Sequence, residues 1–472
     1  MTSRLKQAYS PAEFRRQGHA LIDQLADYLE GVGQMPANPY ADPEESLAYF
    51  RQLLDRGPSP GDVIAETLQH SVHLHHPAYM GHQVVPPAPL TALSDVAASL
   101  LNNGMAIFEM GRAGTAMERI VIERFADLLG LSPATGGFLT SGGSLANLTA
   151  LLCARAKKGP VERPCVLVSE QAHYCVERAV GVMGWEKERI VHLPTDEELR
   201  IDPLPLRQTV LDVLDKGLTP VALVANACTT STGSFDPIDR LAEVAEEFGI
   251  WLHVDGAHGA AVRLCPEFRD RARGLELADS VTLDFHKMLM VPALTTGLFF
   301  RDPQDAYRTF HQRAEYLFQS DFEDDWSNVA KRSFECTKRM LSLRVYILLS
   351  TYGPELFRDY VRTVGELGRQ LAGLVRKTPD LELFMEPDIN IVCFRFVHVS
   401  LNHLSRNAVN ELIRSRLTES GQTYIVQTRI SGHTYLRCTL TNCFTTVREL
   451  EQMLFQVVAI GHDLVALRLM VP

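Results

Sequence analysis

The chain has 472 residues, 46% of them hydrophobic and 22% charged, a composition typical of a folded protein of two or three domains. It excludes disorder as a description of the whole chain. Acidic residues number 57 against 46 lysines and arginines, a formal net charge of -11, whereas proteins that bind a nucleic-acid backbone are usually basic. We therefore expect no nucleic-acid partner.

The N-terminus lacks the apolar segment of a secretory signal, and no uninterrupted apolar run is long enough to predict a membrane span. The nine cysteines are scattered and include no Cys-x-x-Cys pair. This spacing favours free thiols in a reducing compartment over disulfides or structural zinc. We expect a cytoplasmic protein without membrane association.

Residues 1–94 are predicted to form a helical segment that depends on another surface. In the first helix, apolar residues recur close to a 3.6-residue period. They are Phe14, Leu21, Ile22, Leu25 and Leu29. A proline-rich link separates them from a second helical stretch at 62–75. Because two such segments cannot close a core alone, we expect them to cover the rest of the chain or a partner subunit.

Residues 95–354 alternate between strand and helix patterns. Apolar runs at 165–168, 221–224 and 250–254 predict strands buried on both faces, and helical stretches such as 238–248 separate them. This alternation predicts a large α/β domain with an open, mostly parallel sheet. Residues 355–472 predict a smaller α+β domain with strands at 391–396 and 435–440.

Three polar features lie where predicted strands end, which is where ligands bind in such sheets. The Thr-Ser-Gly-Gly-Ser loop at 140–144 precedes a helix, whose N-terminus suits a phosphate. Asp255 and Lys287 each close an apolar strand. The ordinary alternatives are a helix cap, a turn residue and a solvated lysine. Together, an anion cradle, a carboxylate and an amine match the phosphate, ring nitrogen and aldehyde of pyridoxal 5'-phosphate.

Several segments carry a specific resemblance: residues 140–144, 171–179, 251–259 and 265–269, and the pair His286-Lys287. They resemble the group II pyridoxal-phosphate-dependent amino-acid decarboxylases, which include the aromatic-amino-acid, glutamate, cysteine-sulfinate and diaminobutyrate enzymes. The resemblance runs from residue 13 to the C-terminal helix. It implies fold type I of the PLP-dependent transferases and a homodimer clasped by its N-terminal helices. It also implies a carboxy-lyase that converts an L-amino acid into its amine and CO2.

The resemblance also implies residue roles. Lys287 would form the Schiff base with the cofactor, Asp255 would pair with the pyridinium nitrogen, and His173 would stack on the ring. The remaining cofactor-binding residues would be Gly142, Gly143, Ser144, Thr230, Ala257 and His286. Arg437 would bind the substrate α-carboxylate. Tyr316, in a polar loop at 313–325, would return a proton to Cα. The competing explanations are a capping histidine, a structural arginine and an ordinary loop tyrosine.

The substrate side chain is less well defined. Gln83 and Ala106 replace bulky rings of the aromatic branch, which favours a polar substrate, either acidic or diamino. Four residues are hypothetical readers of that side chain: His82, Gln83, Phe108 and Arg112. Arg112 would suit an acidic substrate, and Asp284 or Glu109 a basic one. The sequence at 284–287 is Asp-Phe-His-Lys where the family commonly has Asn-Pro-His-Lys, a variant that resembles the diaminobutyrate branch.

Two other functions stay open. One is a decarboxylation-dependent aldehyde synthase, although relatives of that kind tend to have phenylalanine at the position of Tyr316. The other is a catalytically dead regulatory homologue, which the presence of Lys287, Asp255, His173 and Tyr316 disfavours. Five histidines between residues 70 and 82 have no carboxylate or cysteine at ligand spacing, so we expect no metal.

Overall fold

The computed structural model describes residues 2–310 and 326–469. They form two compact units. The larger contains Gln83–Arg369 and Met385–Val392, and the smaller contains Met1–His82, Gln370–Phe384 and Cys393–Pro472. The division expected from the sequence, with boundaries after residues 94 and 354, stays a prediction.

The larger unit contains a seven-stranded sheet. Its strands are β1 (Gly136–Thr140), β2 (Pro164–Ser169), β3 (Ile190–Leu193), β4 (Thr219–Asn226), β5 (Trp251–Asp255), β6 (Ser280–Asp284) and β7 (Thr296–Phe300). Their order is β1-β7-β6-β5-β4-β2-β3. Strands β2 to β6 run parallel, whereas β7 is antiparallel to both of its neighbours, β1 and β6. The predicted mostly parallel sheet is therefore confirmed.

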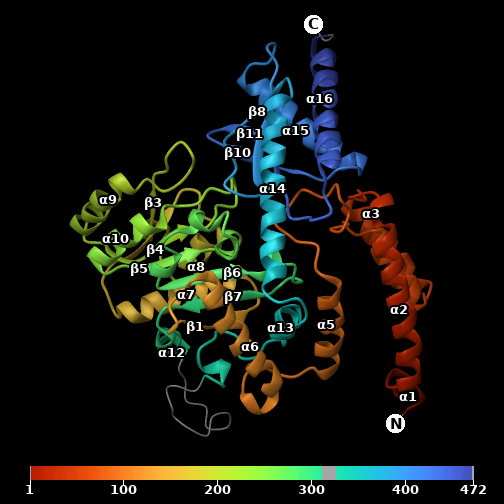
Figure 1. Cartoon of the computed structure of the whole chain (residues 1–472), viewed down its shortest axis with the longest axis horizontal. Coiled ribbons are helices and arrows are strands. Elements are labelled where there is room, and N and C mark those ends of the chain that lie inside the picture. Colours follow the sequence, from red (N-terminus) through yellow and green to blue (C-terminus); the bar gives the residue numbers. More distant parts are fainter. Residues whose placement is uncertain (1, 311–325, 470–472) are drawn as a thin grey trace. The chain divides into compact units, whose positions relative to one another are not determined.

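Helices pack against this sheet or against the helices that cover it (Figure 1). They are α5 (Pro89–Leu101), α6 (Phe108–Leu129), α7 (Gly143–Lys158), α8 (Cys175–Val182), α9 (Pro203–Asp215), α10 (Ile238–Phe248), α11 (Phe285–Met288), α12 (Tyr307–Phe310) and α13 (Ser342–Tyr352). In α10, Ile238, Leu241, Ala242 and Ala245 are buried. Their spacing places them on one helix face, which packs against β4 and β5. All side chains of β5 are buried, as expected for a strand covered on both faces.

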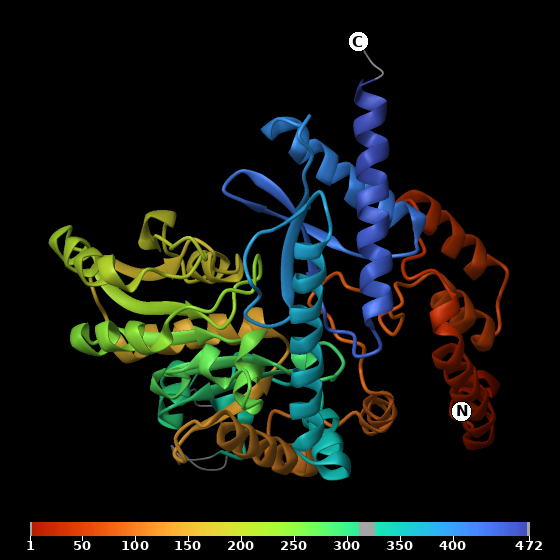
Figure 2. The same ribbon diagram turned by 45° about the horizontal axis from the view of Figure 1, so that its top comes forward.

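The smaller unit is an α+β structure, and two of its elements, α14 and β9, continue from the larger unit. Its helices are α1 (Ser3–Ala8), α2 (Pro11–Gly31), α3 (Pro43–Asp55), α4 (Pro60–Gln69), α14 (Glu355–Lys377), α15 (His403–Ser420) and α16 (Val447–Leu469). Its strands are β8 (Leu381–Leu383), β9 (Ile391–Phe396), β10 (Val426–Ile430) and β11 (His433–Thr439), in the order β10-β11-β9-β8. Helix α15 packs on β11 and beside α16 (Figure 2). The smaller α+β region expected at the C-terminus is thus present.

The N-terminal segment differs from the predicted pair of helices, because α3 begins at Pro43 in the stretch predicted to be a link, and α4 is shorter than the stretch predicted at 62–75. A capping box between Ser59 and Asp62 starts α4, and His70 ends it. Beyond the helix, the backbone N–H of His73 donates to the carbonyl of Ala37 at 3.1 Å. This loop contact was not visible as a sequence pattern.

One helix of the described chain, Val447–Leu467 within α16, is long and apolar enough to cross a membrane. Such a single helix is weak evidence, because the core helices of soluble proteins meet the same criteria.

Candidate active site

The predicted site residues follow strands that point in one direction. Strand β1 runs the same way as β6, because both are antiparallel to β7. The carboxyl ends of β1, β2, β4, β5 and β6 therefore meet at one edge of the sheet. Asp255 ends β5, and Lys287 lies in α11 directly after β6. This edge is where open α/β sheets bind their ligands.

A cavity of about 240 Å³ lies at this edge. All nine residues predicted to bind the cofactor line it: Gly142, Gly143, Ser144, His173, Thr230, Asp255, Ala257, His286 and Lys287. The other lining residues are Ser141, Asn147, Cys175, Asn226, Cys228, His258, Asp284 and Leu294. The fold therefore brings the predicted cofactor residues together, while their chemical roles stay predictions.

The loop before α7 is shaped to approach an anion closely. Gly142 has φ of +117°, a backbone conformation that side chains disfavour. A Cβ on Gly143 would lie 3.0 Å from Asp284 Oδ2, so a side chain there would have to displace this carboxylate. No side chain caps the first turn of α7, a helix of 16 residues. Its N–H groups and its positive helix end are thus available to a phosphate.

Lys287 forms an ion pair inside the cavity. Its Nζ lies 3.0 Å from Asp284 Oδ2, and His286 Nε2 lies 3.6 Å from the same oxygen. Burial lowers the pKa of Lys287, but the carboxylates of Asp284 and Asp255 outweigh burial and hold this pKa above its usual value. Burial raises the pKa of Asp284. The positive charges of Lys287 and His286 lower it by more, so this pKa lies below its usual value. Both partners are therefore charged in the cofactor-free site.

Substituting Asp284→Asn is expected to lower the pKa of Lys287, because a neutral amide replaces the charge closest to the ammonium. The neutral amine then becomes available at lower pH. Labelling of Lys287 by an amine reagent in cofactor-free protein, followed across pH by peptide mass spectrometry, should shift its midpoint to lower pH. Asp279→Asn is the control, since Asp279 pairs with Arg301. An unshifted midpoint in Asp284→Asn would contradict this pairing in solution.

Asp255 is 7% exposed and is fixed by hydrogen bonds on both oxygens. Asn147 Nδ2 donates to Oδ2 at 2.8 Å, and the backbone N–H of Ala257 donates to Oδ1 at 3.2 Å. Sequence reasoning missed Asn147. A signal existed, because Asn147 is an amide side chain within the buried, mostly apolar stripe of α7.

His173 lines the cavity from the segment after β2. Burial lowers its pKa, and the charge of Lys287 acts in the same direction, whereas that of Asp255 opposes both. Its Nδ1 accepts a hydrogen bond from the backbone N–H of Cys175 at 3.3 Å, which is the capping contact weighed as the alternative role. The ring can cap the chain and still present a face to the cavity.

The predicted substrate-binding residues do not line this cavity. Arg437 and His82 belong to the smaller unit. There, burial lowers the pKa of His82, with further lowering from the charges of Arg437 and Arg414. Gln83, Phe108 and Arg112 belong to the larger unit. Tyr316 lies outside the described residues.

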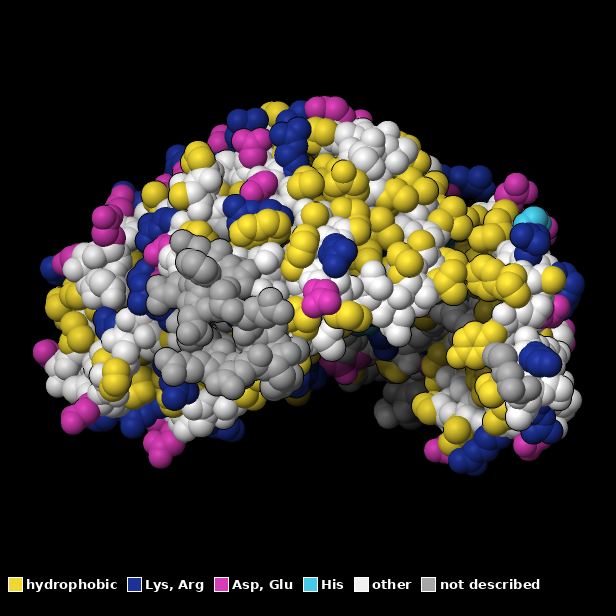
Figure 3. All heavy atoms as spheres, turned by 90° about the horizontal axis from the view of Figure 1, so that it is seen from below, with side chains coloured by type: hydrophobic (Ala, Val, Ile, Leu, Met, Phe, Trp, Pro, Cys, Tyr) yellow, Lys and Arg dark blue, Asp and Glu magenta, His cyan; other side chains and the backbone are white. Residues whose placement is uncertain are grey.

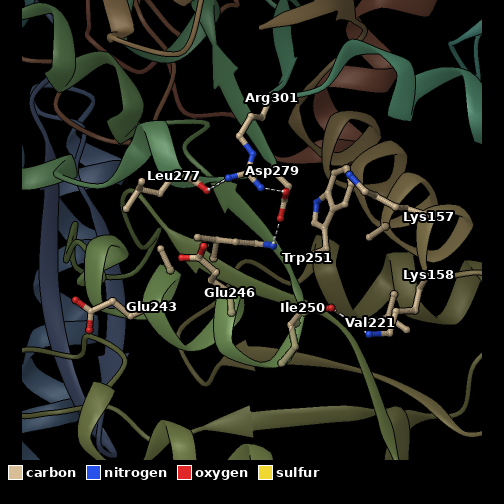
Figure 4. A pocket seen from close by; sticks show the side chains of 15 residues that line it. Lys157, Lys158, Val221, Glu243, Glu246, Ile250, Trp251, Leu277, Asp279 and Arg301 are labelled. Atoms are coloured by element: carbon tan, nitrogen blue, oxygen red, sulfur yellow. Dashed lines mark hydrogen bonds and ion pairs between the residues drawn. The ribbon is translucent and has the colours of Figure 1, made fainter. Parts of the chain in front are cut away.

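A second cavity, of about 520 Å³, lies at the opposite ends of the strands and contains none of the predicted residues (Figure 4). Trp251 opens β5 on its wall, and the guanidinium of Arg301 pairs with Asp279. Lys157 lies 2.7 Å from Asp305, and Lys158 donates to the carbonyl of Gly249 at 3.0 Å. These cations are already paired, so this cavity is a poorer candidate for an anionic ligand.

Comparison with known proteins identifies the family. Residues 59–397 match the model of the pyridoxal-dependent decarboxylase conserved domain. The chain belongs to this family. It is 27% identical over 463 residues to the aromatic-L-amino-acid decarboxylase of Bacillus atrophaeus, covering 96% of both chains. It is 30% identical over 378 residues to an L-2,4-diaminobutyrate decarboxylase of Rhizobium meliloti, covering 79% of this chain and 76% of the relative.

Solved structures agree with this family. The crystal structure of Catharanthus roseus tryptophan decarboxylase in complex with L-tryptophan matches with a TM-score of 0.87 and 26% identity, covering 96% of this chain and 99% of that chain. The predicted fold type I is confirmed. As a member of the pyridoxal-dependent decarboxylases, the protein is a carboxy-lyase that uses pyridoxal phosphate.

The cavity residues fit this cofactor. The uncapped end of α7 offers donors to a phosphate, the buried Asp255 carboxylate suits a protonated ring nitrogen, and the Lys287 amine suits an aldehyde. Among residues 2–310 and 326–469, no cluster of three or more histidine, cysteine or acidic side chains is arranged to hold a metal ion.

Proposed function

We propose that this decarboxylase converts a polar L-amino acid into its amine and CO2, using pyridoxal phosphate held in the 240 Å³ cavity. One observation carries the proposal. Lys287, Asp255 and the uncapped end of α7 line the same cavity although they come from separate parts of the chain. An amine, a carboxylate and a helix N-terminus are the three groups that the cofactor requires.

The cavity residues divide the work of holding the cofactor. The loop Gly142, Gly143 and Ser144 would bind the phosphate with backbone N–H groups, with His286 beside it. Lys287 would anchor the aldehyde covalently. The remaining residues would contact the ring: His173 on one face, Ala257 on the other, Asp255 at the nitrogen, and Thr230 at the edge near the substrate carboxylate.

When bound, pyridoxal phosphate supplies an electron sink for the bond broken at Cα. The side chains of the protein would contribute a negative charge at the ring nitrogen and would orient the substrate. The buried Asp255 carboxylate would hold a proton on the ring nitrogen, because a negative charge beside that nitrogen stabilises its protonated form. Arg437 would orient the substrate carboxylate out of the ring plane, since orientation decides which bond breaks. Tyr316 would return the proton to Cα.

A polar substrate, acidic or diamino, is supported by Gln83 and Ala106, which stand where the aromatic branch of the family has bulky rings. The matched relative of Rhizobium meliloti is named for a diamino acid, L-2,4-diaminobutyrate, although the Bacillus relative is named for aromatic amino acids.

A panel of amino acids tests the substrate. We expect CO2 and amine from at least one of diaminobutyrate, ornithine, glutamate, aspartate and cysteine sulfinate. The kcat/KM for this substrate should exceed that for tryptophan and tyrosine at least about tenfold, the discrimination expected from one well-placed polar contact. A preference for an aromatic substrate would contradict the polar assignment. Aldehyde with peroxide would indicate an aldehyde synthase, and no turnover at all a regulatory homologue.

We also propose a cytoplasmic homodimer. All nine cysteines are free thiols, which fits a reducing compartment. Helices α2, α3 and α4 bury no residue within the chain, although α2 carries an apolar stripe. A further set of exposed apolar side chains lies on α5 and the start of α6, and hydrophobic side chains gather on the face seen in Figure 3. This set comprises Leu93, Val96, Leu100, Leu101, Phe108 and Met110. Both surfaces would be covered by a second copy.

Substituting Ile22→Glu in α2 is expected to weaken the dimer at least about tenfold, because burial of an isoleucine side chain contributes about 1.5–3 kcal/mol. Sedimentation velocity across protein concentrations measures the change. Ala20→Glu introduces the same charge on the opposite, exposed face of α2 and should leave the dimer intact. Equal effects of the two variants would argue against α2 as the clasp.

A further inference from the structure

A buried network of side chains from α7, β5 and β6 supports Asp255. Asn147 Nδ2 donates to Asp255 Oδ2 at 2.8 Å and to the sulfur of Cys175 at 3.2 Å. On its other side, Asn147 Oδ1 lies 2.8 Å from Thr282 Oγ1 and 3.1 Å from His253 Nε2. Asn147 is 1% exposed, and Thr282 and His253 are fully buried.

Chemistry fixes the direction of every hydrogen bond in this network. The Asp255 carboxylate only accepts, so the amide atom of Asn147 that faces it is nitrogen. The amide oxygen then faces Thr282 and His253, and both must donate to it. His253 therefore carries a proton on Nε2. Burial lowers its pKa to about 4, so the ring is neutral near pH 7 and its Nδ1 is an acceptor.

The network continues along the same face of the sheet toward the opposite ends of the strands. His253 Nδ1 accepts from Ser280 Oγ at 2.8 Å, and Ser280 Oγ accepts from the indole Nε1 of Trp251 at 2.8 Å. Trp251 stands on the wall of the second cavity (Figure 4). If Asn147 or His253 rotated, a buried donor or acceptor would lose its partner. Asn147 is thus locked in the orientation that presents its N–H to Asp255.

We propose that Asn147 and His253 are positioning residues that hold the Asp255 carboxylate in the orientation that meets the ring nitrogen of pyridoxal phosphate. This inference rests on the proposed function. His253 fixes the amide of Asn147, Asn147 fixes Oδ2 of Asp255, and the backbone N–H of Ala257 fixes Oδ1. This network would strengthen one contact to the cofactor, the contact between Asp255 and the ring nitrogen. Binding at the phosphate and the aldehyde does not depend on it.

That separation allows a test by ligand binding to the full-length, cofactor-free chain. Two ligands are compared, pyridoxal phosphate and its deaza analogue, in which a C–H group replaces the ring nitrogen. We expect the wild-type chain to prefer pyridoxal phosphate. Asn147→Leu, close to isosteric, should reduce this preference about tenfold and leave the affinity for the deaza analogue unchanged, since a hydrogen bond to a charged group contributes about one order of magnitude.

Thr149→Val is the matched control. Thr149 lies two residues further along α7, is also 1% exposed, and its hydroxyl has no hydrogen-bond partner. It should keep the wild-type preference. His253→Leu should reduce the preference, and His253→Gln, which still offers an N–H donor, should restore part of it. An equal loss of affinity for both ligands in Asn147→Leu, or an undiminished preference, would overturn the positioning role.

Asp255→Asn separates this inference from the proposed function. If Asp255→Asn loses the preference and Asn147→Leu keeps it, the positioning role alone fails. If Asp255→Asn also keeps the wild-type preference, Asp255 does not meet the ring nitrogen, and the proposed site fails together with the inference. A loss of preference in both variants, with Thr149→Val unaffected, supports both.

Discussion

Substituting Lys287→Ala is expected to lower the kcat for decarboxylation by at least about 10³-fold, because the variant loses the proposed covalent anchor for the cofactor and a group that can move protons beside it. The structure gives a reason why no other residue replaces it. Lys287 is the single lysine lining the cavity in the described part of the chain, and it is paired there with Asp284 at 3.0 Å.

The covalent attachment of the cofactor to Lys287 can be tested without an assay of decarboxylation. Borohydride reduction of the cofactor-loaded protein, followed by peptide mass spectrometry, should locate the cofactor on the peptide containing Lys287. Lys158→Ala is the control, because Lys158 lies on the second cavity and donates to the carbonyl of Gly249. Labelling of a different lysine in the wild-type chain, or retained visible absorbance of bound cofactor in Lys287→Ala, would contradict the assignment.

Substituting Asp255→Asn is expected to lower kcat by about 10²–10³-fold while the affinity for the phosphate group is preserved. The amide has nearly the shape of the carboxylate but lacks its charge, so it cannot hold a proton on the ring nitrogen. Asn147 Nδ2 would also face an amide instead of a carboxylate, and this buried contact would weaken. Steady-state kinetics with the best substrate of the panel measure the loss.

Asp279→Asn is a suitable control for this second prediction. Its carboxylate pairs with Arg301 at the opposite ends of the strands, next to the second cavity. Its kcat should stay within about threefold of wild type, the scatter expected of a substitution away from the chemistry. A comparable loss of kcat in both variants would mean that Asp255 acts through stability, and thermal unfolding of both variants would show it.

Much of the active-site region could be predicted from local pattern. The glycine loop, Asp255 and Lys287 were predicted to end parallel strands, and strands of one direction deliver their ends to the same edge. Site residues in the interior of a helix or strand were harder to predict from the sequence. In the sequence, Asn147 and His253 are isolated polar residues in apolar segments. The hydrogen bonds that give them a role are made to residues more than 100 positions away in sequence. No spacing rule links such partners.

The sequence by itself determined the class of chemistry, because the strand-ending glycines, carboxylate and amine, and the family motifs that contain them, are local features. It also predicted that the N-terminal helices cover another surface, since their apolar stripe is readable from periodicity. Only the tertiary structure decided that Asp284 neutralises Lys287 and that a chain of hydrogen bonds orients Asp255. Burial turns such polar groups into obligatory partners, and burial is a property of the packed fold.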